Sequence, residues 1–590
     1  MAARIVQAAV SGHFCDPKTN KIMKKKLLTL LALSAVLATG LKAQSLVWAK
    51  NFGGLGQMNY GISLALDANG NSYTTGYFAG TPDFDPGAGT YTVASAGSDD
   101  AYITKFDSSG NFVWAKTFGG TAIDHAISIA LDSKGNIYTA GTFQGTVDFD
   151  PGVGTYTLTS AGGDDNFICK LDAAGNFKWA VRIGNANVDV AANIATDPSD
   201  NVLLTGTFRQ IVDFDPGAGT SNLTSAAFND CFLLKLDSTG TFVWVRQWGG
   251  LSDDGGGVVT SDAAGNIYTT GSFGYIMDLD PTAGTYTVQA SGPNDLFINK
   301  LDAAGNYIWG GYFGGSNSDA VGGITLDALG NIFMTGWFWG NADMDPSPAT
   351  YTVATIQDQD IFVQKLNPSG GLVWVKVMGG TNIDEGLGIA VDGGGNVYTT
   401  GFFQGTADFD PGPGTVNYTP VWGSDIYISC LDVNGNYVSS KQIGGANGDG
   451  ASCIKLDAHN QMYLTGNFGG VVDFDPDAGT YNLTSSGAYD AFVLKMGQTA
   501  GVGIKENTEA LNNVTLFPNP ANGLVNLILD GAFSKYTIKL MNSAGQVVIE
   551  SKDIISPRYT FDVSQLAKGM YFLEISMGGR TSRTKLVKAE

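Results

Sequence analysis

The chain has 590 residues, more than one ordinary domain contains unless the fold is repetitive. Its 81 glycines, with 11% aromatic and only 15% charged residues, exclude a disordered chain and indicate a folded protein rich in turns. A net charge of −22 excludes nucleic acid and anionic membranes as favoured partners, and leaves cations, neutral sugars and basic proteins as compatible ones.

The N-terminal segment has the pattern of an export signal. Met23 is followed by three lysines, residues 27–41 are apolar, and Leu41-Lys42-Ala43 is a loose small-residue cleavage site. The apolar stretch is too short for a membrane-spanning helix, and no other segment reaches the required length of about 18 residues. We therefore expect residues 1–43 to be a signal peptide with its true start at Met23 and cleavage after Ala43, and we expect no transmembrane segment.

A period of 65 residues runs through residues 44–496. Asp-Phe-Asp-Pro or a close variant begins at residues 83, 148, 213, 278, 343, 408 and 473. Gly recurs at residues 76, 141, 206, 271, 336, 401 and 466, and Phe recurs two residues after each of them. Asp recurs at residues 100, 165, 230, 295, 360, 425 and 490. An unbroken period over seven units predicts a repeat architecture.

Each unit predicts four short strands. In the second unit they are residues 127–131, 136–143, 166–171 and 176–180, which are rich in β-branched and aromatic residues. The connection at 171–176 is a hairpin turn, because its Asp can accept backbone hydrogen bonds and its Gly can adopt a positive φ. No segment of helical period interrupts the pattern. Seven sets of four short strands are typical of a β-propeller.

The two ends of the repeat region predict a closed ring. Residues 46–50 match the fourth strand of a unit, and residues 491–495 match a third strand. The N-terminal strand would then complete the last blade, and pairing of the two ends would leave no open sheet edge. We predict an all-β fold whose main body is a closed seven-bladed β-propeller of four-stranded blades.

Two of these stretches also carry a family resemblance. Gly-Asn-Ile-Tyr-Thr-Ala-Gly-Thr-Phe at 135–143, with Gly-Asn-Phe-Val-Trp at 110–114, resembles the SBBP (seven-bladed β-propeller) repeat of bacterial secreted proteins. The resemblance covers about residues 46–496. It implies the propeller fold and says little about function, because most members of that family have no defined activity.

The C-terminal part has a different character. Residues 497–512 have the composition of a linker, and residues 513–590 lack the 65-residue pattern. The C-terminal stretch has a net charge of +3 and residues 44–512 one of −31, which supports separate domains. Alternating residues predict strands at 525–529, 536–541, 546–551, 559–563, 569–576 and 583–588. They predict a small antiparallel Ig-like β-sandwich.

This module resembles the type IX secretion C-terminal sorting domain of Bacteroidetes. The resemblance rests on Leu-Phe-Pro-Asn-Pro-Ala at 516–521, Asn-Ser-Ala-Gly at 542–545, Leu-Ala-Lys-Gly-Met-Tyr at 566–571 and Thr-Lys-Leu-Val-Lys at 584–588. It implies the type IX machinery as a partner and passage through the periplasm and across the outer membrane. Removal of the domain, with attachment to surface lipopolysaccharide or release, would follow. The alternative is an ordinary Ig-like ligand-binding domain.

The repeated Asp-x-Asp pairs are the candidate metal ligands. Two carboxylates at this spacing lie on one face of an extended strand, and Ca²⁺ prefers several oxygen ligands. The alternative is a plain turn in which Asp accepts hydrogen bonds from free amides. The candidates are Asp83, Asp85, Asp148, Asp150, Asp213, Asp215, Asp278, Asp280, Asp343, Asp345, Asp408, Asp410, Asp473 and Asp475. Calcium is the one cofactor that this pattern suggests.

Other polar residues recur in rings. Asp recurs at 124, 189, 254, 319, 384 and 449, with Asn59 in the first unit, and the Asp100 column is followed by lysines at 105, 170, 235, 300, 365 and 495. Such rings favour hydrogen bonding or ion pairing between blades. Sevenfold equivalence argues against catalysis, because a catalytic carboxylate pair needs two different environments. His125 and His459 match no catalytic triad, so we predict no catalytic residue.

Positions that differ between units are the candidate ligand site. Beside the Gly and Phe columns lie Tyr77, Arg209, Trp337 and Trp339. Trp and Arg are enriched in binding sites, although packing between blades is the alternative for the two tryptophans. The Trp column at residues 48, 114, 179, 244, 309 and 374 is expected to be core. Cys430 and Cys453 either form a disulfide or stay single thiols.

These patterns predict an exported, monomeric protein, either secreted or on the outer cell surface. Its expected role is a non-catalytic binding or scaffold module for a glycan or protein ligand, because propellers present loops around a central channel. The alternative is a secreted polysaccharide hydrolase or lyase with its site at the channel mouth. Loss of sevenfold symmetry at one channel face would favour that alternative.

Overall fold

A computed structural model describes residues 44–54, 58–498, 514–529, 535–542, 547–577 and 580–589. The predicted signal peptide and residues 499–512 of the predicted linker lie outside these residues. The chain divides after Gln498 into two units, here called the repeat body (44–498) and the C-terminal domain (514–589). The described residues form strands and no helix, so none of them belongs to an apolar helix that could cross a membrane.

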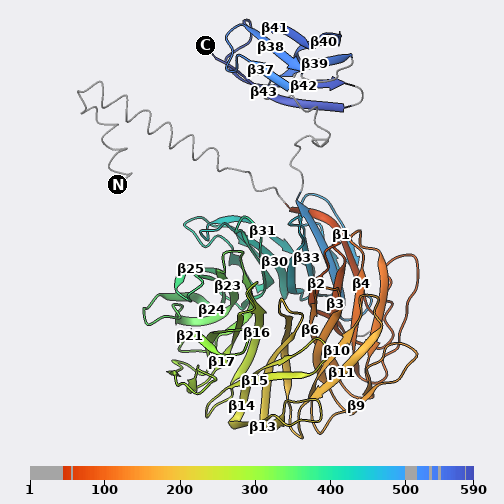
Figure 1. Cartoon of the computed structure of the whole chain (residues 1–590), viewed down its shortest axis with the longest axis vertical. Coiled ribbons are helices and arrows are strands. Elements are labelled where there is room, and N and C mark those ends of the chain that lie inside the picture. The colour runs from red at the N-terminus through yellow and green to blue at the C-terminus, as the bar shows by residue number, and fades with distance from the viewer. Residues whose placement is uncertain are drawn as a thin grey trace, which may run out of the picture. The chain divides into compact units, whose positions relative to one another are not determined.

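Each of the first six repeats of the body forms antiparallel pairs among four strands that follow one another in chain order (Figure 1). The strands of the first three units are β2 (Asn59–Leu66), β3 (Ser72–Ala79), β4 (Asp99–Phe106) and β5 (Phe112–Phe118); β6 (Asp124–Leu131), β7 (Ile137–Phe143), β10 (Asp165–Leu171) and β11 (Phe177–Ile183); and β12 (Val190–Thr196), β13 (Val202–Asp213), β14 (Asn222–Leu236) and β15 (Phe242–Trp248). The predicted strands of the second unit therefore exist, with bounds that differ by a few residues.

The later units repeat this arrangement. Their strands are β16 (Gly255–Ser261), β17 (Ile267–Phe273), β20 (Asp295–Leu301) and β21 (Tyr307–Gly315); β22 (Ala320–Leu326), β23 (Ile332–Asp343), β24 (Thr352–Leu366) and β25 (Leu372–Gly380); β26 (Asp384–Val391), β27 (Val397–Gln404), β30 (Ser424–Leu431) and β31 (Tyr437–Ile443); and β32 (Gly450–Leu456), β33 (Met462–Phe468) and β36 (Asp490–Gln498). Two-residue pairings also join β21 to β23 and β25 to the next unit.

A small hairpin between the second and third strands was not predicted. It consists of β8 (Thr146–Asp148) and β9 (Thr157–Thr159), β18 (Ile276–Asp278) and β19 (Thr287–Gln289), β28 (Ala407–Asp408) and β29 (Asn417–Tyr418), and β34 (Val471–Asp473) and β35 (Asn482–Thr484). In the third and fifth units the same pairing extends the long strands β13, β14, β23 and β24. The Asp-x-Asp turn lies at the tip of this hairpin.

The last sheet of the body contains strands from both ends of the repeat region. β1 (Gln44–Phe52) pairs antiparallel with β36, so that the sheet has the order β1-β36-β33-β32. In Figure 1 the red β1 lies beside the blue strands that end this region. The first strands of successive units contact one another in the order β2, β6, β12, β16, β22, β26 and β32, and β32 in turn contacts β2.

The core of the body lies between neighbouring sheets. Buried Phe118 of β5 packs in one cluster with Phe143 and Phe167 of the next sheet. The equivalent cluster at the two chain ends joins Trp48 of β1 to Phe78 of β3, across the first and last sheets. Apolar side chains on both faces of each sheet are thus removed from water, which is the main stabilising term in such a fold.

The C-terminal domain consists of two sheets around one core. β37 (Val514–Phe517), β38 (Leu524–Leu529) and β41 (Arg558–Asp562) form one sheet, and β40 (Val547–Ile554), β39 (Tyr536–Met541), β42 (Gly569–Met577) and β43 (Arg580–Lys588) form the other. Val525 and Leu527 of the first sheet share a buried cluster with Ile538 and Leu573 of the second. Strand β37 was not predicted.

The four cysteines of the body are free thiols. Cys169, Cys231 and Cys430 are buried, and Cys453 is half-buried. Cys430 and Cys453 therefore form no disulfide in this structure, and the single-thiol alternative describes both.

Candidate functional site

The positions that vary between repeats gather at one end of each sheet. We define the variable rim as positions 60, 77, 79 and 99 of the first unit and their equivalents at 65-residue steps, ending at 450, 467, 469 and 489. Position 60 lies opposite 77 in the strand register, and 79 lies opposite 99, so the four side chains share one face of the sheet. All four sequence-predicted ligand residues lie on this rim.

Tyr77 belongs to a group of aromatic residues that spans three sheets. Its ring stacks on the imidazole of His125 in the second unit, with centroids 3.8 Å apart, and lies 5.0 Å from Tyr60. Tyr60 is 6.0 Å from Tyr489, which belongs to the last unit. His125 Nε2 lies 3.1 Å from Oδ2 of Asp99. Burial raises the pKa of Tyr77 to about 12, so its hydroxyl stays protonated at neutral pH.

Arg209 lines a hollow on the rim between the second and third units. The hollow has a volume of ≈ 300 Å³ and its other lining residues are Gly163, Ala186, Asn187, Val188, Val190, Thr207 and Asn229. The Arg209 side chain is exposed, and its Cζ lies 5.7 Å from the ring centroid of Phe228. No hydrogen bond or ion pair of this guanidinium is formed within the described part of the chain.

Trp337 and Trp339 occupy alternate positions on β23. Trp337 is half-buried, whereas 43% of Trp339 is exposed. The indole Nε1 of Trp339 donates to the carbonyl oxygen of Gln357 at 3.3 Å, which fixes the ring orientation. Tyr77, Arg209 and these two tryptophans come from three different sheets, and each has its own neighbours. The structure therefore places the four residues at equivalent ends of their sheets but gives each a separate set of contacts.

Several rim residues were not identified from the sequence. His125 was considered only as a member of a triad, and Tyr60, Asp99 and Tyr489 were not considered. The signal was present, because positions 60 and 99 vary between repeats as much as position 77 does. The missing information was the register, which puts these positions beside position 77 and the next sheet.

The Asp-x-Asp turns have the same hydrogen bonds in every unit. In the second unit, Oδ1 of Asp148 accepts from the amides of Asp150 at 3.0 Å and Tyr156 at 2.8 Å. Oδ1 of Asp150 accepts from the amide of Gly152 at 2.8 Å. The first carboxylates of the other units, at 83, 213, 278, 343, 408 and 473, also accept two amides each. These bonds alone account for an Asp at both positions.

The metal-binding interpretation has a limited donor set. Among the described residues, no three or more His, Cys, Asp and Glu side chains lie close enough together to hold a metal ion. A calcium site at one turn would therefore need backbone carbonyls or water beside its two carboxylates, because Ca²⁺ takes six to eight oxygen ligands. If the turns bind calcium, a chelator should lower the melting temperature of the protein. If they are plain turns, a chelator should leave the melting temperature unchanged.

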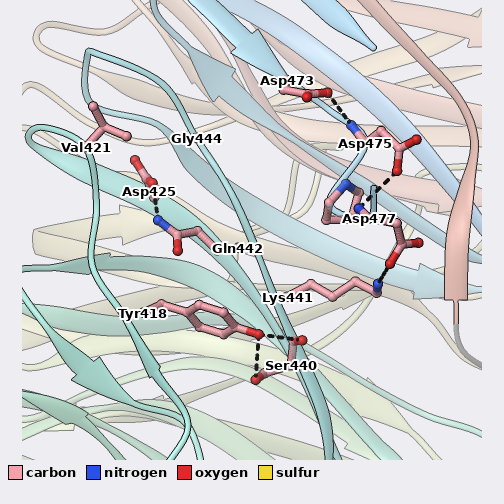
Figure 2. A pocket seen from close by; sticks show the side chains of 11 residues that line it. Tyr418, Val421, Asp425, Ser440, Lys441, Gln442, Gly444, Asp473, Asp475 and Asp477 are labelled. Carbon is pink, nitrogen blue, oxygen red and sulfur yellow. Dashed lines mark hydrogen bonds and ion pairs between the residues drawn. The ribbon is translucent and has the colours of Figure 1, made fainter. Parts of the chain in front are cut away.

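A second hollow lies on the outside of the body, between the sixth and seventh units (Figure 2). It has a volume of ≈ 380 Å³, and residues 65 positions earlier line a smaller one of ≈ 190 Å³. Its polar side chains are already engaged: Asp473 and Asp475 accept turn amides, Asp477 pairs with Lys441, and Asp425 accepts from Gln442 at 2.6 Å. This hollow is therefore a junction between sheets, not a free polar site.

The two Asp rings form carboxylate pairs between neighbouring sheets. A Cβ on Gly379 would overlap Oδ1 of Asp360 and lie 2.9 Å from Oδ2 of Asp384, so both carboxylates face this backbone. Both are buried. Asp384 accepts from the amides of Gly380 and Gln404, but Oδ1 of Asp360 has no hydrogen-bond partner. Burial, with the neighbouring charge, raises the pKa of Asp360 to about 6 and of Asp384 to about 7.

Five further pairs repeat this arrangement. They are 100 with 124, 165 with 189, 230 with 254, 295 with 319, and 425 with 449. At the junction of the last sheet with the first, Asn59 replaces the second acid and faces the unit of Asp490. Because every member is buried and bonded to backbone amides, the rings connect sheets and do not form an open catalytic site.

Four lysines of the column, Lys170, Lys235, Lys365 and Lys495, each donate to a carbonyl oxygen in the last turn of the following unit. Lys235 Nζ lies 2.7 Å from Oδ2 of Asp197 and donates to the carbonyl oxygen of Ala303 at 2.9 Å. The indole Nε1 of Trp244 donates to the same oxygen at 3.4 Å. We call this Lys–Trp pair the turn clamp, because Ala303 lies in the last turn of the following unit. The clamp recurs with Lys170 and Trp179, Lys365 and Trp374, and Lys495 and Trp48.

Comparison with protein families identifies the C-terminal domain. Residues 515–589 match the model of the secretion system C-terminal sorting domain. This domain marks proteins for secretion by the type IX system, so the type IX machinery handles this chain and the protein is secreted or lies at the cell surface. The resemblance expected for this module is thereby confirmed.

The chain is also similar to two curated proteins. An uncharacterized WD repeat-containing protein of Acanthamoeba polyphaga mimivirus is 24% identical over 262 residues, which are 38% of this chain and 19% of that protein. The regulatory protein FlaEY of Caulobacter vibrioides is 22% identical over 340 residues, 54% of this chain and 34% of that protein. The chain thus spans about a fifth and a third of these relatives. WD repeats are four-stranded propeller blades, which agrees with the four-stranded sheets seen here.

Proposed function

We propose that this protein is an exported, closed seven-bladed β-propeller that uses its variable rim to bind a glycan or protein ligand without chemical conversion. The single observation that carries the proposal is the rim itself. The rings of Asp, Gly and Phe are nearly invariant from unit to unit, whereas the rim changes from Tyr60 to His125, Val190 and Glu385 at one position alone. A purely structural position would tolerate the same residue in every unit.

Ring closure is supported by contacts between the first and last strands of the repeat body. β1 completes the sheet of β32, β33 and β36, and β32 contacts β2 as the other first strands contact their neighbours. Trp48 and Lys495 hold the turn of the first unit at Ser108. Closure matters for function because it brings Tyr489 of the last unit to Tyr60 of the first, at 6.0 Å.

The chemistry of the rim suits recognition. Aromatic side chains offer flat apolar area, and amides, an arginine and carboxylates beside them offer directed hydrogen bonds. Apart from Thr142, Gly274 and Gly469, which are buried, the rim positions are half-buried or exposed, so most rim side chains are reachable from solvent. Trp339 is the clearest example, because its indole is held in place by one hydrogen bond and is still 43% exposed.

A glycan array with the full chain tests the proposal. The wild-type protein should bind a defined set of glycans, and Trp339→Ala or Tyr77→Ala should weaken that binding at least tenfold, about 1.4 kcal/mol. Tyr351→Ala, which removes an exposed tyrosine of an outer turn, is the matched control and should bind like the wild type. If the two rim variants bind as tightly as the control, the rim is not the site.

A polysaccharide hydrolase or lyase is the second candidate, and two observations favour it. The rim lacks sevenfold symmetry, and burial raises the pKa of Glu385, as a general acid requires. Incubation of the protein with acidic and neutral polysaccharides, followed by measurement of new reducing ends and unsaturated products, tests this role. Activity that disappears in Glu385→Gln would replace the binding proposal by an enzymatic one.

The N-terminal signal peptide and the C-terminal sorting domain would together direct export of the protein. We propose that the signal peptide, which begins at Met23, is cleaved after Ala43 during export and that the sorting domain then directs passage across the outer membrane. A variant that lacks residues 513–590 should stay inside the cell. Its appearance at the cell surface, or a mature protein that still contains Leu30, would contradict this route.

A further inference from the structure

We propose that the hollow beside Arg209 binds an acidic sugar, with the guanidinium of Arg209 recognising its anionic group. This inference rests on the proposed binding function of the variable rim and specifies one ligand class for it. It depends on the state of Arg209, the shape and lining of the hollow, and the charge of the surrounding body.

Arg209 differs from the other two arginines of residues 44–498. Arg182 pairs with Asp165 at 2.6 Å, and Arg246 donates to three backbone carbonyls of its own and the next sheet. The guanidinium of Arg209 has no such partner within the described residues and only faces the ring of Phe228. An exposed arginine held over an aromatic ring keeps its five donors available to a ligand.

The backbone around Arg209 is fixed, so the side chain starts from a defined place. Its amide donates to Oδ1 of buried Asp189 at 3.1 Å, and its carbonyl oxygen accepts from Nδ2 of Asn185 at 2.6 Å. The same Asn185 amide group also donates to the carbonyl oxygen of Ile211. A preorganised arginine loses less entropy when it binds a planar anion.

The lining of the hollow suits a sugar ring. Val188 and Val190 provide apolar surface, while Thr207, Asn187 and Asn229 provide hydroxyl and amide groups. The volume of ≈ 300 Å³ is at the lower end of small-molecule sites. Gly163 is part of the wall, and a Cβ there would lie 3.0 Å from the carbonyl oxygen of Asn187 and 3.2 Å from Val188.

The positive charge of the Arg209 guanidinium indicates that the ligand carries an anionic group. The guanidinium fork matches a carboxylate or a sulfate, and either would form charge-assisted hydrogen bonds with it. Neutral sugars would leave this cation without a partner within residues 44–512, whose net charge is −31. That background repels long polyanions, so we expect a short acidic segment and a marked dependence on salt.

The test uses the full chain and defined probes. Binding of a galacturonic acid trisaccharide, a galactose trisaccharide and a sulfated galactose trisaccharide is measured by calorimetry for the wild type and Arg209→Gln. The wild type should bind at least one acidic probe ten times more tightly than the neutral one, and Arg209→Gln should abolish this preference. The stronger acidic probe identifies carboxylate or sulfate as the recognised group.

Controls separate this inference from the proposed function. Lys178→Gln removes a cation paired with Asp172 at 2.9 Å in the turn at the opposite end of its sheet, and it should keep the preference. Equal affinity for acidic and neutral probes, or an unchanged preference in Arg209→Gln, would overturn the inference and leave the rim proposal standing. Binding of an acidic peptide in preference to every sugar probe would also overturn it. A wild type that binds no glycan at all would contradict glycan recognition by the rim itself.

Discussion

The indole Nε1 of Trp48 donates a hydrogen bond of 3.3 Å to the carbonyl oxygen of Ser108, which lies in the last turn of the first unit. Lys495, which is opposite Trp48 in the register of β1 and β36, donates to the same oxygen at 2.9 Å. Gly110 of this turn packs on the indole, since a Cβ there would lie 2.7 Å from Cδ2 of Trp48. The first and last strands of the repeat body, β1 and β36, together therefore hold the last turn of the first unit.

The sixth unit lacks the Lys and the Trp of the turn clamp. Its equivalent positions carry Cys430 and Ser439 in place of Lys and Trp. The turn that these residues would hold is absent, because the seventh sheet takes its fourth strand from β1 and the chain leaves the body at Gln498. A clamp is present only where a turn follows, so the substitutions in the sixth unit have a structural reason.

Trp48→Ala is expected to destabilise the repeat body by about 3–5 kcal/mol, because it empties a buried indole site and leaves the Ser108 carbonyl with one donor fewer. Urea unfolding of the full chain measures the change. Ser439→Ala, at the exposed equivalent position of the sixth unit, is the control and should stay within about 0.5 kcal/mol. Equal effects of the two substitutions would contradict a closing role for Trp48.

The carboxylate pairs predict that the protein becomes more stable as the pH falls from 8 to 5. Free aspartate has a pKa of about 3.9, whereas burial raises the pKa of Asp254, Asp319, Asp384 and Asp449 to about 7. Folding therefore takes up protons, and this contribution is complete below about pH 4 and is lost as the pH rises through 6–7. The melting temperature at pH 5 should exceed that at pH 8.

One substitution isolates a single pair. Asp360→Asn keeps an oxygen for the amide of Ile356 and puts a donor where Oδ1 now has no partner, next to Asp384. The variant should be more stable than the wild type at pH 8 by on the order of 1–2 kcal/mol, with a shallower pH dependence. Asn59→Asp, which adds an acid at the junction that lacks one, should make the pH dependence of stability steeper. Parallel pH profiles for all three proteins would show that the pairs do not titrate together.

The Asp-x-Asp turns should be insensitive to chelators. Since Oδ1 of Asp148 already accepts two amides, we expect the same melting temperature with EDTA and with calcium. Asp148→Asn should be nearly neutral because an amide oxygen can accept both bonds, while Asp148→Ala should lose about 1–2 kcal/mol. A lower melting temperature in EDTA, with a smaller EDTA effect in Asp148→Asn, would establish calcium binding instead.

Gly154 is expected to tolerate a side chain only if the Asp150 carboxylate moves away. A Cβ at this position would overlap Oδ2 of Asp150, so Gly154→Ala should destabilise the turn by about 1–3 kcal/mol. The fifth unit has Ala349 at this position, and there the alanine amide donates to Oγ of Ser347 at 3.2 Å. Ala349→Gly is the reciprocal control and should have little effect, measured in the same thermal unfolding experiment.

Much of the candidate site could be predicted, because its residues lie on strands whose positions are set locally. The 65-residue period placed Tyr77, Arg209, Trp337 and Trp339 beside the Gly and Phe columns, and the structure puts all of them on the rim. His125 was missed, because its relation to Tyr77 depends on the packing of two sheets and not on any local pattern. The hollow beside Arg209 was missed for the same reason, since Gly163 comes from the loop before β10 and Asn187 from the loop after β11.

The sequence by itself determined the strands, their turns and the period, since alternation of side chains and glycines with positive φ act within a few residues of the chain. It also indicated that the first strand belongs to the last sheet, because that strand copies the pattern of a fourth strand. Only the tertiary structure decided which carbonyl each Trp and Lys holds and which carboxylates share a junction. It likewise decided which side chains meet on the rim, because neighbours across sheets depend on register and on the distance between sheets.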